Sequence, residues 1–124
     1  MNPKRILVID DDDGVRTTIE LSLEATTNWE ILTAASGKEG LILAESQRPD
    51  AILLDVMMPD FSGIEMLQQF QSNTTTQNIP VIFITAKIME REKQEMRNLG
   101  IKGIISKPFN AVGLWREIHL LLQW

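Results

Sequence analysis

Four consecutive aspartates, residues 10–13, directly follow the first apolar segment of the chain. Adjacent carboxylates repel one another unless a cation or helix amide groups neutralise them. We expect Asp12 or Asp13 to cap the helix that follows, because the helix dipole favours negative charge at its start. Capping does not explain Asp10 and Asp11, and clustered or buried charges in proteins are usually paired or metal-bound. We therefore interpret Asp10 and Asp11 as metal ligands.

Three other polar residues also follow short apolar segments. Asp55 would complete an all-oxygen set with Asp10 and Asp11, and such a set suits Mg²⁺ or Mn²⁺. Thr85 offers a hydroxyl, and Lys107 offers an ammonium group that carboxylates or a phosphoryl group would attract. A threonine or a lysine alone would indicate little. Together these residues match the needs of phosphoryl transfer, which are a metal clamp, charge stabilisation and a positioned nucleophile.

The elements that must position these residues alternate along the chain. Short apolar or alternating segments predict five strands, at 6–9, 30–34, 51–54, 81–84 and 103–106. Apolar residues at helical spacing predict five helices, at 15–25, 38–45, 63–70, 89–99 and 111–122. Strict alternation implies a doubly wound α/β fold, a five-stranded parallel sheet with helices on both faces. Ligands of such sheets bind at the carboxyl ends of the strands, which is where the polar residues would meet.

Composition excludes several classes of protein. The 124 residues, 44% of them hydrophobic and 23% charged, fit one globular domain with one core. The net charge of -5 opposes capture of nucleic acid or an anionic membrane, so we expect direct binding to neither. The absence of cysteine excludes disulfides, thiol nucleophiles and cysteine-ligated metals. The first apolar run is too short for a signal peptide, so we expect a cytoplasmic protein.

Several motifs occur in order along the whole chain. They are Ile6-Leu7-Val8-Ile9-Asp10-Asp11, Leu54-Asp55-Val56-Met57-Met58-Pro59 with Gly63, Thr85-Ala86, and Lys107-Pro108-Phe109. In this combination the sequence resembles the receiver domain of response regulators in two-component signalling. The resemblance covers residues 1–124 as one receiver domain and implies a CheY-like, flavodoxin-like sheet in strand order 2-1-3-4-5.

The resemblance also implies a function and a role for each site residue. Asp55 would be the nucleophile that accepts a phosphoryl group from the phosphohistidine of a histidine kinase or a phosphotransfer protein. Asp11, Asp55 and the backbone carbonyl of Met57 would ligate Mg²⁺, and Asp10 would contribute through water. The phosphorylated state would then control a downstream protein, or a second copy of the chain, through the last helix and strand.

Thr85 and Lys107 would, by the same resemblance, bind the phosphoryl oxygens, and the peptide bond before Pro108 would be cis. The family commonly has an aromatic residue in the last strand, where this chain has Ile104, so we expect switching to be muted or differently built. We expect a structural role for the single histidine, His119, because the fold places it far from the strand ends.

Met57 and Lys87 occupy positions that resemble those which tune the phosphate lifetime in the family. Neither side chain is a carboxylate or an amide that would orient an attacking water. We therefore expect phosphate on Asp55 to persist for minutes or longer.

Other functions fit the residues less well. Residues 11–14 also fit the D-x-D-G pattern of haloacid-dehalogenase-like phosphatases, with Asp11 as nucleophile, but those enzymes usually have a longer chain and a cap. A calcium-binding EF-hand would place Ile9 at the first ligand position. A flavin carrier would need a glycine- or hydroxyl-rich phosphate loop where this chain has four acids. The acid, threonine and lysine set argues against a docking module that works without phosphate.

Overall fold

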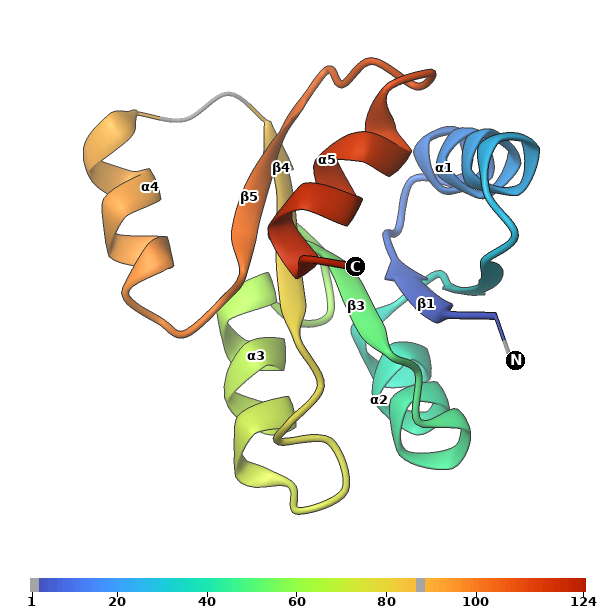
Figure 1. Cartoon of the computed structure of the whole chain (residues 1–124). Coiled ribbons are helices and arrows are strands. Elements are labelled where there is room, and N and C mark those ends of the chain that lie inside the picture. Colours follow the sequence, from blue (N-terminus) through green and yellow to red (C-terminus); the bar gives the residue numbers. More distant parts are fainter. Residues whose placement is uncertain (1–2, 87–88) are drawn as a thin grey trace.

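The computed structural model describes residues 3–86 and 89–124 and has the predicted α/β architecture (Figure 1). Five parallel strands form one sheet in the order β2-β1-β3-β4-β5, which confirms the expected topology. The strands are β1 (Arg5–Ile9), β2 (Glu30–Ala34), β3 (Ala51–Asp55), β4 (Val81–Ala86) and β5 (Gly103–Lys107). The helices are α1 (Asp13–Thr26), α2 (Gly37–Gln47), α3 (Gly63–Ser72), α4 (Glu90–Arg97) and α5 (Leu114–Leu122).

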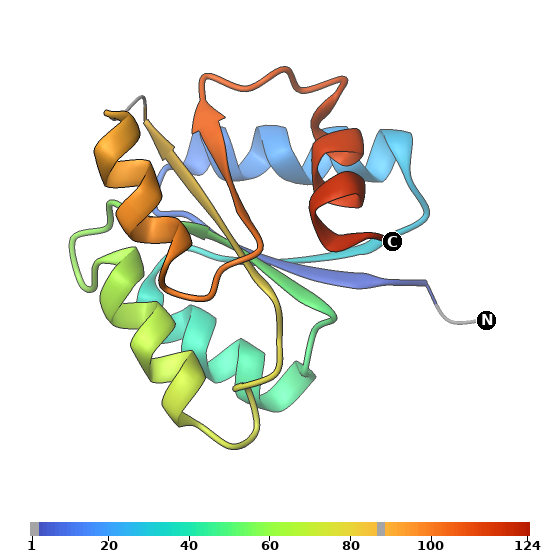
Figure 2. The same cartoon turned by 60° about the vertical axis from the view of Figure 1, so that its left-hand side comes forward.

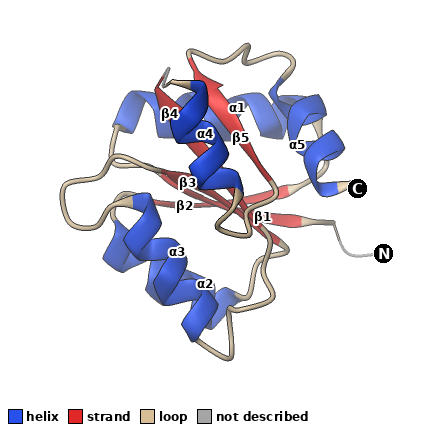
Figure 3. Cartoon of the chain, turned by 90° about the vertical axis from the view of Figure 1, so that its left-hand side faces the viewer, coloured by secondary structure: helices blue, strands red, loops and turns tan. Residues whose placement is uncertain are grey.

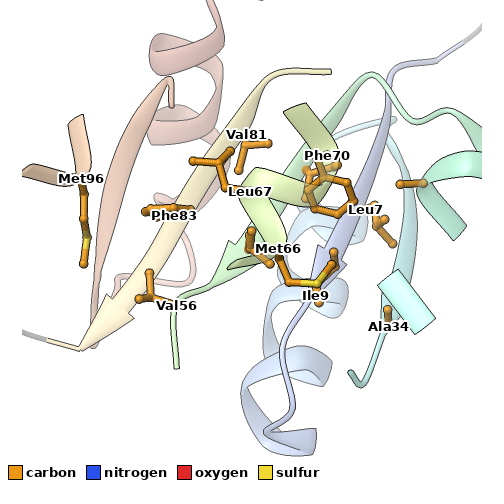
Figure 4. Packing of buried hydrophobic residues seen from close by; sticks show 13 residues of the cluster. Leu7, Ile9, Ala34, Val56, Met66, Leu67, Phe70, Val81, Phe83 and Met96 are labelled. Carbon is orange, nitrogen blue, oxygen red and sulfur yellow. The ribbon is translucent and has the colours of Figure 1, made fainter. Parts of the chain in front are cut away.

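The sheet separates two hydrophobic clusters, so the molecule has three layers (Figure 3). One cluster joins the sheet to α2, α3 and α4 and includes Met66, Phe70, Phe83 and Met96 (Figure 4). The other joins the sheet to α1 and α5. Along β1, alternate residues belong to opposite clusters, because successive side chains of a strand point to opposite faces. Burial on both faces explains why the inner strands are continuous apolar runs.

Side-chain caps set the starts of two helices next to the site. Asp12 is the N-cap of α1, and its side chain accepts a hydrogen bond from the Val15 N–H, which confirms the capping role expected for Asp12 or Asp13. Ser62 and Glu65 form a reciprocal capping box at the start of α3. These local caps fix where the chain leaves the sheet edge and enters each helix.

The last helix begins later than the periodicity predicts. We expected a helix over 111–122, but α5 begins at Leu114. The Asn110 side chain accepts hydrogen bonds from the N–H groups of Val112 and Gly113, which holds the intervening residues in a turn. The apolar spacing continues through this turn, so periodicity alone placed the start of the helix wrongly.

Two further features bear on the sequence predictions. The Lys107-Pro108 peptide bond is cis, as expected. In the part of the chain that the structure describes, none of the helices combines the length and the apolar character required to cross a membrane.

Candidate functional site

The predicted site residues meet at one edge of the sheet because the parallel strands are in register there. Ile9 pairs with Leu54, so the next residues, Asp10 and Asp55, are level with each other. Asp55 in turn pairs with Ile84, the residue before Thr85. Lys107 pairs with Ala86, and β4 and β5 run towards this same edge (Figure 2). These strands therefore end in or beside a site residue: the last residue of β3 is Asp55, the second-to-last of β4 is Thr85, and the last of β5 is Lys107.

Three carboxylates and one ammonium group form the centre of the site. Asp10, Asp11 and Asp55 each offer a carboxylate oxygen within 4.8 Å of the others. Lys107 Nζ lies 3.1 Å from Asp10 Oδ2 and 3.6 Å from Asp55 Oδ1. Asp10 and Asp55 are buried, at 1% and 4% exposure, whereas Asp11 is exposed. The cluster is thus open to solvent on the Asp11 side and closed beneath it.

The electrostatics of Asp55 reflect this crowding. Burial, followed by repulsion from Asp10, raises the pKa of Asp55 to about 6. The Lys107 ammonium and the Met57 N–H, which donates to Asp55 Oδ1 at 3.2 Å, oppose the increase without cancelling it. Burial disfavours the charged form of Lys107, but its contacts with Asp10 and Asp55 outweigh burial and raise its pKa. Lys107 is therefore a permanent cation of the site.

The acidic cluster is chemically suited to a divalent cation. Three carboxylates face one ammonium group, which leaves excess negative charge for a cation to neutralise. The oxygens lie within 4.8 Å of one another, and a hard ion bound at about 2.1 Å holds its ligand oxygens about 3.0 to 4.2 Å apart, so a modest closing of the carboxylates would bring them into range. The donor set is all oxygen, which favours Mg²⁺ or Mn²⁺ over softer metals.

The other predicted residues lie at or near the same edge. Thr85 is buried, and the side chain after it, Ala86, is exposed and small. The Met57 side chain is 73% exposed, so it lies in solvent beside Asp55, whose carboxylate accepts a hydrogen bond from the Met57 N–H. Ile104 is partly buried and packs against the cluster under α3 and α4. Lys87 lies outside the described residues.

The last helix carries the single histidine, His119, and one of the tryptophans, Trp115. His119 lies on α5 with its ring 6.1 Å from that of Trp115. Trp115 itself is partly buried against the cluster formed by α1, α5 and the sheet. Trp115 therefore covers the edge of the domain.

Two residues that sequence reasoning missed hold the loops of the site. Arg16 on α1 bonds to the backbone carbonyl of Asp10 and pairs with Asp13. The Asp–Arg spacing of three residues in a helix could have indicated the second contact. Asp60, in the loop after β3, accepts hydrogen bonds from the N–H groups of Gly37 and Lys38 at the start of α2. No local pattern could have revealed these partners, because they are more than twenty residues away in the sequence.

Replacing Asp60 with alanine should destabilise the protein by about 1 kcal/mol at pH 7, because Asp60 caps α2 from a distant loop. Burial slightly disfavours the charge of Asp60, but the N–H groups of Lys38, Gly37 and Phe61 outweigh it and lower the pKa of the carboxyl. A carboxyl whose pKa is lowered by folding stabilises the protein above its unfolded pKa, and this contribution disappears as the pH falls through the folded pKa.

Urea unfolding between pH 2 and pH 7 checks this prediction. The difference between the parent protein and Asp60→Ala should shrink below a pH of about 4. Asp60→Asn is the matched control, since it keeps an acceptor oxygen without a charge. Its free energy of unfolding at pH 7 should lie between those of the parent and Asp60→Ala. An Asp60→Ala protein as stable as the parent at pH 7 would contradict the capping role.

Comparisons with known proteins agree with this geometry. Residues 6–119 match the family model described as response regulator receiver domain. AfsQ1 of Streptomyces coelicolor, a transcriptional regulatory protein, is 44% identical over 95% of this chain and 51% of its own length. PhoP of Bacillus subtilis, which regulates alkaline phosphatase synthesis, is 36% identical over 97% of this chain and 49% of its own. The chain thus spans about half the length of these curated relatives.

Solved structures are similar over nearly the whole of this chain. The chemotaxis protein CheY4 of Vibrio cholerae superposes with a TM-score of 0.88 at 28% identity, over 97% of this chain and 99% of that one. The receiver domain of the Francisella response regulator 1452 superposes with a TM-score of 0.86 at 30% identity, over 98% of both chains.

Proposed function

The chain belongs to the response regulator receiver domain family, and we propose that it is a phosphoacceptor switch whose nucleophile is Asp55. The observation that carries the proposal is the convergence of Asp10, Asp11 and Asp55 within 4.8 Å around the Lys107 ammonium group. The proposed unit is the whole chain, residues 1–124, acting as one receiver domain.

In the proposed reaction an Asp55 carboxylate oxygen attacks the phosphorus of a phosphohistidine. The new O–P bond forms as the P–N bond to the donor's imidazole breaks, and the imidazole leaves with the bonding electron pair. Asp55 must be ionised to attack, and with its pKa at about 6 it is mostly ionised at neutral pH. The Met57 N–H holds one carboxylate oxygen, which limits the rotation of the side chain.

Lys107 and Thr85 are proposed to bind the oxygens of the phosphoryl group. Lys107 already lies 3.6 Å from Asp55 Oδ1, so its positive charge is next to the position where the phosphoryl charge would arrive. Thr85 is the second-to-last residue of β4, one residue beyond the partner of Asp55, and supplies a hydroxyl donor at the same edge. Once Asp55 is esterified, Lys107 can exchange its contact with the carboxylate for one with the phosphoryl group.

The proposed metal ligands are Asp10, Asp11, Asp55 and the backbone carbonyl of Met57, and the proposed ion is Mg²⁺ or Mn²⁺. When bound, the ion would neutralise the crowded carboxylates and the charge of the transferring phosphoryl group. Asp10 and Asp55 are held by β1 and β3, and Asp11 lies on the solvent side of them. This arrangement leaves room for water and phosphoryl oxygens to complete the coordination.

The proposed partners are a histidine kinase or phosphotransfer protein as donor, and a downstream protein or a second copy of the chain as receiver of the signal. Phosphorylation can act on such a partner only by shifting a conformational equilibrium, so the partner must bind one of the two states more tightly.

Intact mass after incubation with acetyl phosphate tests the proposal. We expect the mass to increase by a single phosphoryl group, to need Mg²⁺ and to be reversed by hydroxylamine. Asp55→Asn should abolish the increase while the protein stays folded. A folded protein with no increase from acetyl phosphate or from a panel of histidine kinases would contradict the proposal. Turnover of a phosphomonoester that is lost in Asp11→Asn but kept in Asp55→Asn would instead favour a phosphatase with Asp11 as nucleophile.

We also propose that dephosphorylation is slow because Met57 presents an apolar side chain beside the nucleophile. In Met57→Asn the amide can orient an attacking water, so phosphate should be lost faster than from the parent protein. The decay of the phosphorylated mass after removal of acetyl phosphate measures both rates. Met57→Leu is the matched control and should decay like the parent. A Met57→Asn protein that holds phosphate longer than the parent would contradict this role.

A further inference from the structure

We infer that Arg16 is a positioning residue for the cation site, because it holds the peptide group that joins Asp10 to Asp11. The inference rests on the proposed function, since it concerns the same site. It assigns a role to a side chain that is not itself a candidate ligand.

Arg16 connects the end of β1 to the first turn of α1. Its Nη1 donates a hydrogen bond to the Asp10 backbone carbonyl at 2.9 Å, and its Nη2 pairs with the Asp13 carboxylate. The side chain is only 19% exposed, so it is held close to the protein. The planar guanidinium has several N–H donors in a fixed arrangement, which lets one side chain fix two acceptors relative to each other.

Holding the Asp10 carbonyl constrains Asp11. The peptide group is planar, so the carbonyl of Asp10 and the N–H of Asp11 lie in one rigid unit. Fixing the carbonyl therefore fixes the direction in which the chain enters Asp11. The constraint from Arg16 matters most for Asp11, because the Asp11 carboxylate is exposed. The Asp10 carboxylate, by contrast, is buried and already held by the Asp12 N–H at 2.9 Å and by Lys107.

Position and charge predict opposite effects of removing Arg16. Arg16 is a cation close to the acidic cluster, so through charge alone its removal should tighten the binding of a divalent ion. If Arg16 acts by position, its removal should weaken binding. Groups that orient metal ligands typically change metal affinity about 10- to 100-fold when they are mutated. The sign of the change therefore separates the two effects.

The experiment is a titration of the full chain with Mn²⁺, in which electron paramagnetic resonance measures the free ion. We expect Arg16→Gln to raise the dissociation constant for Mn²⁺ about tenfold or more. Arg16→Lys keeps the charge but lacks the two-pronged geometry, so it should also bind Mn²⁺ more weakly than the parent. Arg116→Gln, which removes an arginine that lies over the Trp115 ring on α5, is the matched control and should leave the constant unchanged. Circular dichroism establishes that each variant is folded.

Phosphoryl uptake gives a second readout that a general loss of structure would not reproduce. Arg16→Gln should need more Mg²⁺ for half-maximal uptake from acetyl phosphate and should reach a rate close to that of the parent at saturating Mg²⁺. Unchanged or tighter Mn²⁺ binding in Arg16→Gln would overturn the inference, as would a lower maximal rate with an unchanged Mg²⁺ requirement. If Arg16→Gln does not fold, Arg16→Lys decides, and a parent-like dissociation constant for it would overturn the inference.

Failure of the inference and failure of the proposed function give different results. A parent protein that binds Mn²⁺ but never accepts a phosphoryl group would contradict the proposed function and leave the role of Arg16 to be decided by the titration. A parent protein that binds no Mn²⁺ would overturn both. A parent protein that is phosphorylated normally, with Arg16 variants that bind Mn²⁺ as it does, would overturn only the inference.

Discussion

Gly63→Ala should lower the free energy of unfolding by about 2 kcal/mol, because the site has no space for the added methyl group. A Cβ at position 63 would lie 2.7 Å from Val56 Cα and 3.0 Å from the Asp55 carbonyl oxygen, and both atoms are backbone. The Gly63 N–H also donates to the Val56 carbonyl at 2.7 Å, so α3 begins directly against the turn that follows Asp55. Either α3 or this turn must move.

The same substitution should slow phosphoryl uptake about 10- to 100-fold, since a displacement of the order of 1 Å at a reacting group has effects of that size. Urea unfolding and the rate of mass increase with acetyl phosphate measure the two effects. Gly113→Ala is the matched control, because the nearest atoms to its Cβ would be 3.9 and 4.0 Å away. It should change stability by less than about 0.5 kcal/mol. A Gly63→Ala protein with the stability and uptake rate of the parent would contradict the close contact.

Asp55→Asn should have the opposite effect on stability and make the metal-free protein more stable at pH 7. Folding raises the pKa of Asp55 from 3.8 to about 6, so the folded state favours the protonated, neutral carboxyl. The ionised group therefore destabilises the fold, increasingly from a pH near 4 up to about 6 and constantly above that. An increase of the pKa from 3.8 to about 6 corresponds to about 3 kcal/mol, which is the upper limit of the expected gain.

Urea unfolding in EDTA from pH 4 to pH 8 measures this gain. The difference between Asp55→Asn and the parent should be largest above pH 6 and should nearly vanish at pH 4. Adding Mg²⁺ should stabilise the parent more than the variant, because an ion that binds the folded state adds its binding free energy to stability. Glu45→Gln, which neutralises an exposed carboxylate on α2, is the control and should change the free energy of unfolding at pH 7 by less than about 0.5 kcal/mol. An Asp55→Asn protein that is less stable than the parent in EDTA at pH 7 would contradict the predicted destabilisation by the ionised Asp55 carboxylate.

The two variants together separate stability from function. Gly63→Ala should weaken both, whereas Asp55→Asn should strengthen the fold and abolish phosphoryl uptake. When a site needs closely spaced like charges for its chemistry, neutralising one of them is expected to stabilise the fold and to abolish the function.

The residue pattern by itself determined the alternating α/β architecture with a parallel sheet and the position of the candidate site, whereas the strand order followed from the resemblance to the family. Strands buried on both faces must be continuously apolar, and such runs are visible at 6–9, 51–54 and 81–84. The alternation of strands and helices requires a parallel sheet, and the carboxyl ends of parallel strands share one edge. For that reason a polar residue after each run was sufficient to predict that Asp10, Asp55 and Thr85 lie at the same edge of the sheet. The Asp12 cap was also predictable, because a cap is a contact within one turn of a helix.

Only the tertiary structure decided how burial and ion pairing differ among the four aspartates. Asp10 is buried against Lys107, Asp11 is exposed, and Asp13 pairs with Arg16. The raised pKa of Asp55 likewise depends on burial and on a neighbour from another strand. The hydrogen bonds from α2 to Asp60 join residues more than twenty positions apart. Such distances and burials arise only when separate segments pack together, so no local pattern of residues can encode them.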